Sequence, residues 1–493
     1  MWKSISPCIP RPIFPIPSAP PAAKKSTRKP TEDCRFSFAY SPLHRIETCF
    51  NFRTVSLYVN HEEPSSKWKE TFVVNRENSA HSDVLIVGGG VIGLACAWYL
   101  ARLGKSVRIV EEESVGSGAS HGNCGILFFS DLVPLCAPGA ISHELMRLLQ
   151  GTSPLYIKPR PDFSLAFWLL RFAANCTAGQ RSHAMRAKES ILRTSMELFD
   201  ELLAEENLDC DHDRRGVIMA FTDPKYLEGY AKTSRMLEPF GFAPTYLDRE
   251  SVRQLEPALS HRVCGGWHHH TDSHLRPDAL VKAWGRAVRD AGVTIEENCR
   301  LESFETRSGV VRRARTSNGT FSADQFILAT GAWTAAIARQ FNLRIPVQPG
   351  KGYSITMEKP SACPEMPCYL YERNVVVTPW KSGFRLGGTM EFSGFGTDLT
   401  RRRLDHLESA AAFYLQTPIG RRVEERWAGL RPMCCDDLPI IGRTPGWDNL
   451  LLATGHGMLG VTMATGTGRL IADLILDRKP PFDPRPFAVE RFR

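Results

Sequence analysis

The sequence predicts a mixed α/β fold in which a nucleotide-binding domain is built from separated segments of the chain. A short apolar strand pattern runs into a glycine-rich turn and then a helix pattern at residues 84–101. Strand and helix patterns alternate near both ends of the 493 residues, while hairpin patterns lie in the middle. The composition, 43% hydrophobic and 23% charged, is typical of a globular protein with a large core.

Residues 1–81 differ from everything that follows. They contain proline-dense tracts such as PCIPRPIFPIPSAPP, and no apolar periodicity persists in them. We therefore expect a disordered N-terminal extension. A start site assigned too far upstream and a targeting peptide are the alternatives, although proline-dense sequence makes a poor signal helix.

Charge and cysteine content narrow the class of protein. Most of the net charge of +8 lies in the first 80 residues, so the folded body is nearly balanced and a nucleic-acid-binding role has little electrostatic support. The 14 cysteines include no C-x-x-C pair, which predicts free thiols in a reducing, cytoplasmic compartment. Even the adjacent Cys434 and Cys435 are expected to be plain thiols.

The uncharged stretch VLIVGGGVIGLACAWYLA, residues 84–101, is long enough for a membrane span, yet its glycines indicate a nucleotide site. Gly88, Gly90 and Gly93 match G-x-G-x-x-G, with Val91 and Ile92 between the last two. In this motif the glycines allow a tight turn, a close approach to a pyrophosphate and helix–strand packing. Glu111 ends the next strand, SVRIVE, where a carboxylate can accept hydrogen bonds from a ribose.

Three more glycine turns favour FAD over a nicotinamide cofactor, because FAD is long and contacts many loops. The loop GSGASHGNCG follows the second strand at residues 116–125. ILATGAW contains a strand that ends before Gly331, and GHGMLGVTMATGTG opens the last helix at residue 455.

The remaining elements alternate along the chain. An aromatic-rich helix is expected at Asp162–Cys176, either as a core helix of a second domain or, as the less favoured alternative, as a surface that meets a membrane and a quinone. An amphipathic helix follows at Ser182–Glu206. A helix and strand are expected in PDALVKAWGRAVRDAGVTIEEN, and a hairpin in RNVVVTPWKSGFRLGGTMEF.

Four histidines invite a metal interpretation, which we do not favour. His268, His269 and His270 are consecutive, so on a strand they point to opposite faces and cannot converge on one ion. His274 does not complete a ligand set, and no metal site is predicted. His268 and His270 share a face and could border a pocket, although ordinary strand histidines are the simpler interpretation.

At this point the chain resembles a known family. The segments VGGGVIGLACAWYLARLG, SHGNCG, GGWHHHTDSHLRPDALV, LATGAW, PGKGYS, WAGLRPMCCDDLPIIGRT and ATGHGMLGVTMATGTGRLIADLI are similar to those of the D-amino-acid-oxidase superfamily of flavoproteins. Within it, the bacterial D-amino-acid dehydrogenase small subunits are the most similar group. The resemblance covers the chain from about Asp83 to its end.

The resemblance implies an FAD-binding Rossmann-like domain with a parallel sheet and a substrate domain with a large antiparallel sheet. We expect residues 82–150, 265–345 and 425–493 in the FAD-binding domain, and residues 151–264 and 346–424 in the substrate domain. The implied cofactor contacts are Gly88, Gly90, Val91, Ile92, Gly93, Glu111, Ser120, Asn123, Gly125, Leu301, Gly331, Gly455, His456, Gly457, Leu459 and Gly460.

Arg431 in GLRP matches the family position that binds the substrate carboxylate, a task suited to a planar guanidinium. Tyr353 in KGYS is a second candidate, and a half-buried strand tyrosine is an equally good interpretation. The family's Pro-Asp-Gly turn is replaced here by Cys435-Asp436-Asp437, where we expect an aspartate to adopt the left-handed conformation of the glycine. These departures bear on the substrate and not on the cofactor.

The implied reaction is the oxidative deamination of a D-amino acid to a 2-oxo acid and ammonia, with hydride transfer from Cα to flavin N5. The implied electron acceptor is a quinone or another respiratory carrier, and the implied location is cytoplasmic or peripheral to the inner membrane. A glycine, sarcosine or D-hydroxyproline oxidoreductase of the same superfamily is the nearer alternative. A flavin-binding subunit without turnover is the alternative from another class.

Overall fold

The computed structural model describes residues 46–51, 54–59, 81–142 and 155–492. The chain divides into two compact units, Met1–Arg76 and Glu77–Arg493. In the first, strands β1 (Ile46–Asn51) and β2 (Thr54–Val59) pair antiparallel. Most of the predicted extension lies outside the described residues, so its disorder stays a prediction. All further description concerns the second unit.

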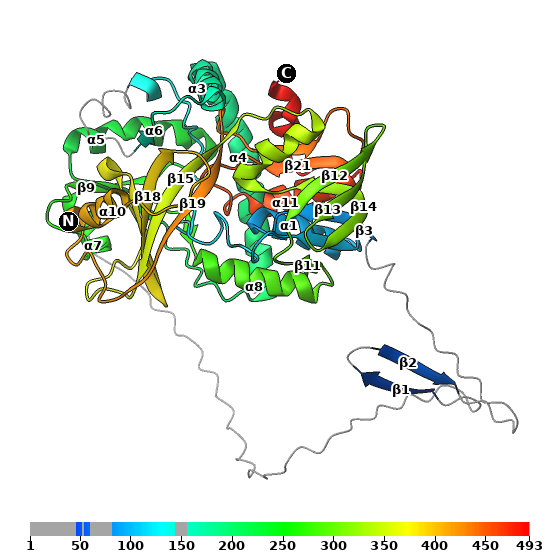
Figure 1. Ribbon diagram of the computed structural model, residues 1–493. Helices are drawn as coiled ribbons and strands as arrows, with labels where there is room; N and C mark the ends of the chain where they lie inside the picture. Colours follow the sequence, from blue (N-terminus) through cyan, green and yellow to red (C-terminus); the bar gives the residue numbers. More distant parts are fainter. Residues whose placement is uncertain (1–45, 52–53, 60–80, 143–154, 493) are drawn as a thin grey trace, which may run out of the picture. The chain divides into compact units, whose positions relative to one another are not determined.

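An eight-stranded sheet forms one half of the second unit (Figure 1). Its strands are β3 (His81–Val87), β4 (Val107–Val110), β11 (Thr294–Glu296), β12 (Leu301–Arg307), β13 (Val310–Thr316), β14 (Gly319–Leu328), β20 (Ile440–Arg443) and β21 (Leu450–Thr454). The order is β11-β4-β3-β14-β13-β12, and β21 also pairs with β14. The pairs among β11, β4, β3, β14 and β21 are parallel, as predicted for a nucleotide-binding sheet.

Strand side chains alternate between the two faces of this sheet, so each strand contributes to a core on either side. Helices cover one of the two faces. Val84 and Ile86 of β3 pack in the core that includes helices α1 (Val91–Arg102), α4 (Ala178–Glu206), α8 (Pro277–Asp290) and α11 (Ala464–Ile475). Leu85 and Val87 pack in a second core on the other face. Helices α1 and α11 approach so closely that a Cβ atom at Gly468 would lie 2.6 Å from the Ala95 carbonyl.

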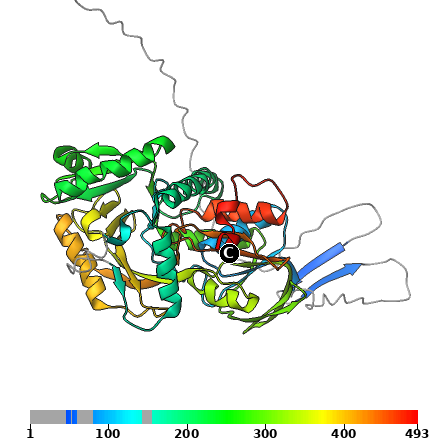
Figure 2. The ribbon, with the colours of Figure 1, turned by 90° about the horizontal axis from the view of Figure 1, so that it is seen from above.

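A nine-stranded, largely antiparallel sheet forms the other half. Its strands are β6 (Leu155–Ile157), β7 (Val217–Phe221), β8 (Thr245–Leu247), β9 (Gly265–His269), β15 (Val347–Met357), β16 (Cys368–Leu370), β17 (Val375–Trp380), β18 (Gly383–Phe392) and β19 (Val423–Cys434). Helix α10 (Arg401–Tyr414) contributes buried leucines and alanines to the core behind it. Figure 2 shows the two halves from above.

Shorter elements complete the second unit. They are the β5 (Ile126–Leu127) and β10 (Ser273–His274) pair, and the helices α3 (Phe163–Asn175), α5 (Pro224–Gly229), α6 (Ala231–Leu237), α7 (Arg249–Leu255) and α9 (Thr334–Ile337). The mixed fold with one parallel and one antiparallel sheet is confirmed. In the described ranges, no helix is long and apolar enough to cross a membrane.

The two sheets exchange strands at different residues from those expected. Strand β9 and nearly all of β19 belong to the nine-stranded sheet, although they fall in segments predicted for the FAD-binding domain. Strand β19 of one sheet is connected to β20 of the other by only a short turn. No linker of distinct composition therefore marks the point where the chain passes between the sheets. The domain limits themselves stay a prediction.

Helix α3 differs from the favoured core interpretation. Leu165 and Trp168 are buried, but Phe163, Phe167 and Leu170 are 90%, 57% and 70% exposed. One side of the helix therefore packs inward, and the other presents an apolar surface.

The close packing of α1 on β3 leads to a first prediction. A Cβ atom at Gly93 would lie 1.9 Å from the Gly88 carbonyl oxygen, which is backbone and cannot move aside. We expect Gly93→Ala to destabilise the protein by about 1–3 kcal/mol, the usual cost of overpacking, and to lower its FAD content. Thermal unfolding and the ratio of flavin to protein absorbance measure both effects. Gly118→Ala is the matched control, because no atom lies within 4 Å of its added Cβ; equal losses in the two variants would contradict the prediction.

Candidate active site

Four parallel strands of the eight-stranded sheet end at one edge, and each is followed by a residue predicted to touch the cofactor. Gly88 follows β3, Glu111 follows β4, Gly331 lies just beyond β14, and Gly455 follows β21. Ligands of open parallel sheets bind at the carboxyl ends of the strands. The fold therefore brings these four residues, far apart in sequence, to one binding edge.

The first glycine turn is built for close backbone approach. Gly88 has φ +108°, and a Cβ atom there would lie 2.5 Å from the Ala329 carbonyl oxygen. Helix α1 begins after Gly90 with no side-chain cap from that residue and no acidic residue in its first turn, which includes Val91, Ile92 and Gly93. The positive end of the helix thus remains available to a phosphate.

Glu111 stands beside this turn. Its Oε2 atom accepts a hydrogen bond from the Gly89 N–H at 2.6 Å, and its Oε1 atom accepts one from the Glu113 N–H at 3.1 Å. Burial raises the pKa of the carboxyl group, while these backbone hydrogen bonds act to lower it. The carboxylate is therefore fixed at the end of β4, where a ribose would lie.

The loop after β4 closes over the turn. The Ser120 hydroxyl accepts from the Val91 N–H at 3.0 Å, and the Asn123 amide donates to the Ser120 carbonyl at 2.9 Å. The Asn123 Oδ1 atom accepts from the Gly125 N–H at 2.9 Å. Gly125 has φ +73°, and an added Cβ would lie 2.1 Å from the Leu275 carbonyl oxygen, so no larger residue fits there.

Residues 455–460 form a second tight turn before α11. Gly455 and Gly457 have φ +77° and +55°, and the Leu459 N–H donates to the His456 carbonyl at 3.0 Å. The His456 ring is buried against the Thr467 hydroxyl, 3.0 Å from Nε2, and burial lowers its pKa to about 3. Gly460 completes the turn.

Two predicted contacts lie further along the same sheet. Threonine hydroxyls join the turns after β14 and β21, since Thr454 donates to the Gly331 carbonyl at 2.9 Å. Leu301 begins β12, and its backbone pairs with Thr316 of β13. The contact of Leu301 with an adenine ring stays a prediction.

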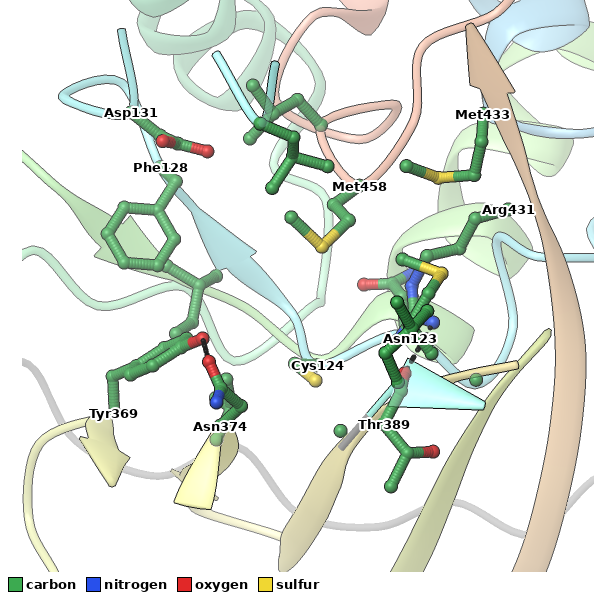
Figure 3. Close-up of a pocket in the computed structure, with 18 of the residues that line it drawn as sticks. Asn123, Cys124, Phe128, Asp131, Tyr369, Asn374, Thr389, Arg431, Met433 and Met458 are labelled. Atoms are coloured by element: carbon green, nitrogen blue, oxygen red, sulfur yellow. Dashed lines mark hydrogen bonds between the residues drawn. The ribbon is translucent and has the colours of Figure 1, made fainter. Parts of the chain in front are cut away.

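A cavity of about 940 Å³ extends from these loops to the nine-stranded sheet, a volume at the upper end for small-molecule sites (Figure 3). Asn123, Cys124 and Gly125 border it on the cofactor side. Much of the remaining wall is apolar or aromatic and includes Phe128, Trp168, Phe172, Met390, Phe392, Trp427 and Met433. One cavity thus joins the cofactor loops to an apolar chamber.

Arg431 of β19 projects into this cavity (Figure 3). Its Nη1 atom donates to the Thr389 carbonyl at 3.0 Å, and within the described ranges no carboxylate forms an ion pair with it. Burial lowers the pKa of the guanidinium. Gly352 makes room for it, because an added Cβ there would lie 2.1 Å from Nη1. A half-buried cation without a counter-ion favours an anionic ligand.

Gly352 of β15 faces Arg431. Tyr353 is the next residue on the strand, so its side chain points to the opposite face. Its hydroxyl is 3.1 Å from Glu391 Oε2 and 3.1 Å from the Thr400 hydroxyl. Tyr353 lines the same cavity as Arg431, but its hydroxyl is engaged by Glu391 and Thr400. Its role toward a substrate stays a prediction, and the described contacts are those of a buried strand tyrosine.

The turn after Arg431 keeps its shape despite its altered sequence. Asp437 has φ +58°, which confirms that an aspartate takes the left-handed conformation. Its Oδ2 atom accepts from the buried Lys188 ammonium at 2.9 Å and from the Leu135 N–H at 3.0 Å.

Cys434 and Cys435 are free thiols, as are the other cysteines whose side chains the structure describes.

The pocket-bordering alternative for His268 and His270 does not fit the structure, whereas the simpler interpretation does not conflict with it. His268 bonds to the Arg215 carbonyl at 2.8 Å and His270 to the Thr245 hydroxyl at 2.7 Å, so neither borders the cavity. His269, on the other face, lines it. Alternation correctly separated the two faces, but which face turns inward depends on how the sheet packs.

Sequence reasoning missed several cavity residues, including Phe128, Ser130, Asp131, Tyr230, Tyr369, Asn374, Thr389 and Trp427. No motif marks most of them. Trp427 carried a signal in the glycines around it: added Cβ atoms at Gly122 and Gly429 would lie 2.1 and 2.0 Å from its ring. Glycines that flank a large aromatic residue in this way indicate a ring held in a slot.

The residues fit a long dinucleotide. They offer a helix N-terminus without acidic residues in its first turn for a pyrophosphate, a fixed carboxylate for a ribose, and glycine turns where side chains would collide. A parallel sheet whose strand ends carry such a cradle beside an apolar cavity defines the dinucleotide-dependent oxidoreductases.

The sequence comparisons specify the class further. Residues 83–474 match the FAD dependent oxidoreductase (DAO) family, and residues 47–115 match pyridine nucleotide-disulphide oxidoreductases. The chain belongs to the DAO family of FAD-dependent oxidoreductases, and FAD is its cofactor.

Relatives named D-amino acid dehydrogenase are similar over nearly their whole length. The one from Allorhizobium ampelinum is 31% identical over 418 residues, which are 83% of this chain and 98% of the relative. The one from Methylobacterium nodulans is 33% identical over 409 residues, or 80% and 96%.

Solved structures share the fold at lower identity. Glycine oxidase from Geobacillus kaustophilus has a TM-score of 0.65 at 23% identity, covering 83% of this chain and 98% of that one. Glycine oxidase from Bacillus cereus has a TM-score of 0.64 at 22% identity, covering 81% and 96%.

The unneutralised Arg431 leads to a prediction on anion binding. We expect Arg431→Met to retain FAD but to bind acetate or benzoate at least tenfold more weakly, because hydrogen bonds to a charged group contribute about 1.5–3 kcal/mol each. Titration of the flavin absorbance spectrum measures the affinity. Arg443→Met, on β20 and outside the cavity, is the control. Equal affinities in wild type and Arg431→Met would refute the assignment.

His456 leads to a prediction on pH. Its pKa is about 3 when folded, below the roughly 6.5 of an unfolded chain. Between these values only the unfolded state binds the proton, so stability is lost as pH falls from about 6.5 toward 3, by about 1.4 kcal/mol per unit. We expect the stability of wild type relative to His456→Gln to fall with this slope. Denaturant unfolding at pH 6.5, 5.5 and 4.5 in excess FAD tests it, and parallel pH profiles would contradict it.

Proposed function

We propose that the protein oxidises D-amino acids to 2-oxo acids and ammonia and passes the electrons to an acceptor other than oxygen. The observation that carries this proposal is Arg431, a half-buried guanidinium with no carboxylate partner in the described chain, inside a cavity that reaches the cofactor loops. An amino acid supplies the missing carboxylate. The relatives named D-amino acid dehydrogenase support the D configuration and the acceptor class.

Arg431 fixes one end of the substrate. Two parallel hydrogen bonds to a carboxylate set its plane and so restrict where Cα and its hydrogen lie. Cys124 of the cofactor loop borders the same cavity, and burial raises the pKa of its thiol, which therefore serves as a neutral wall. The bound FAD supplies the oxidising chemistry by accepting the hydride from Cα at N5.

The rest of the cavity favours an apolar side chain. Phe128, Met390, Phe392 and Met433 offer hydrophobic surface, and methionines adapt to ligands of different shape. Water is kept from the reacting atoms by the same surface. A wall of this kind supports substrates larger than glycine.

The proposed acceptor is a quinone or another respiratory carrier, reached at a membrane surface. Helix α3 supports this part of the proposal, because Leu169 and Phe172 line the cavity while Phe163, Phe167 and Leu170 of the same helix are exposed. An apolar surface at a cavity wall is suited to a hydrophobic acceptor.

A panel of substrates tests the proposal. We expect anaerobic wild-type protein to be bleached by D-alanine or another apolar D-amino acid at least 100-fold faster than by the L-form. Reoxidation of the bleached protein by a short-chain ubiquinone, compared with air, tests the acceptor. Bleaching by glycine or sarcosine alone would assign the chain to the glycine oxidases that share its fold. A flavoprotein that no amine reduces would instead be a binding subunit.

A further inference from the structure

Four side chains form a continuous hydrogen-bonded series at the wall of the cavity. The Tyr230 hydroxyl is 2.9 Å from Nε2 of His269, and Nδ1 of His269 is 2.7 Å from the Ser130 hydroxyl. The Ser130 hydroxyl is 2.6 Å from Oδ2 of Asp272. Tyr230, Ser130 and His269 all line the cavity that contains Arg431, and Asp272 lies behind them.

The direction of the series follows from its chemistry. An ionised Asp272 only accepts hydrogen bonds, so the Ser130 hydroxyl donates to it. The Ser130 oxygen then accepts from the Nδ1–H group of His269, which leaves Nε2 without a proton to accept from the Tyr230 hydroxyl. Every hydrogen in the series therefore points from the cavity toward Asp272.

Burial gives the members different proton affinities. Ser130, His269 and Asp272 are each at most 2% exposed. Burial lowers the pKa of His269 to about 3, so the ring stays neutral and transmits a proton without retaining it. Burial raises the pKa of Asp272 to about 7, which suits a group that accepts a proton near neutral pH.

Other charged groups surround the series. Asp131 faces Asp272 and Tyr230, and it is itself near Lys188 and Asp437. His268 precedes His269 on β9, His270 follows just beyond the strand, and Tyr369 and Tyr371 lie near Tyr230. Asp131 acts to raise the pKa of Asp272, and Lys188 acts to lower the pKa of Asp131.

The oxidation requires an acceptor for a proton. An amino acid binds chiefly as its ammonium form, but the nitrogen needs a free lone pair before hydride can leave Cα. Arg431 holds the carboxylate and, being a cation, cannot take this proton. We propose that the Tyr230–His269–Ser130–Asp272 series, named here the proton relay, deprotonates the substrate ammonium; this rests on the proposed function.

The proton transfers balance without any redox change. The ammonium gives a proton to the Tyr230 oxygen as the Tyr230 proton moves to Nε2 of His269. The Nδ1 proton moves to the Ser130 oxygen, and the Ser130 proton moves to Oδ2 of Asp272. The products are a neutral amine, ready for oxidation, and a neutral Asp272. Tyr230 is the catalytic residue, and the other three act through it.

The test uses Asp272→Asn and Tyr230→Phe in the holoprotein, with flavin reduction followed anaerobically by stopped flow from pH 6 to 10. We expect both variants to be slower at pH 7 by about 100-fold, the usual contribution of a positioned base. As pH rises past the pKa of the free amine, the substrate enters neutral and the rates should recover toward wild type. Tyr246→Phe is the control, an exposed tyrosine that packs against Trp267, as Tyr230 also does.

The outcomes separate the relay from the function. Variant rates and pH profiles that equal wild type, or a loss that stays constant at every pH, would overturn the relay and leave the proposed function standing. A wild-type protein that no amino acid reduces would overturn both. Should Asp272→Asn lose FAD, the isosteric Tyr230→Phe decides the result alone.

Discussion

The site depends on a half-buried guanidinium that has no counter-ion among the described residues. Arg431 donates a hydrogen bond to the Thr389 carbonyl, and the missing side chain of Gly352 leaves room for its guanidinium. No carboxylate in the described chain forms an ion pair with it. A ligand carboxylate would supply the interaction that this charge lacks in the described chain. The same strand, β19, carries Trp427 and Gly429. These two residues and Arg431 occupy alternate positions, so they lie in one row on the same face of the strand.

A second guanidinium, which is fully buried, joins the two halves of the unit. Arg385 of β18 is 1% exposed and donates to the carbonyls of His121 and Asn123 at 3.1 and 2.8 Å. Thr378 of β17 donates to the Cys124 carbonyl at 2.6 Å. The cofactor loop is thus held in place by the antiparallel sheet, although it begins in the parallel one. A displacement of either sheet would change the spacing between the cofactor and Arg431.

Much of this site could be predicted from sequence because its chemistry is local. Gly88, Gly93 and Glu111 lie in one strand–turn–helix–strand segment, and each role follows from that turn. The left-handed Asp437 followed from the conformational preferences of one residue. The inward-facing His269 did not, because alternation defines two faces without saying which one is buried. Nor did Ser130, whose partners lie 139 and 142 residues away and belong to no motif. The exposed apolar side of helix α3 could not be predicted from hydrophobic periodicity either, because an exposed apolar side and a buried one have the same sequence pattern.

The order of the segments along the chain has a consequence for biosynthesis. The turn at residues 455–460, a predicted part of the cofactor cradle, follows almost the whole polypeptide. Strand β21 beside it pairs with a strand more than a hundred residues earlier. A chain still emerging from the ribosome therefore holds the first glycine turn long before the last one exists. Neither sheet can be completed by an N-terminal half alone, and cofactor capture becomes one of the final events of synthesis. Until then the apolar strands that await their partners are surfaces for chaperones.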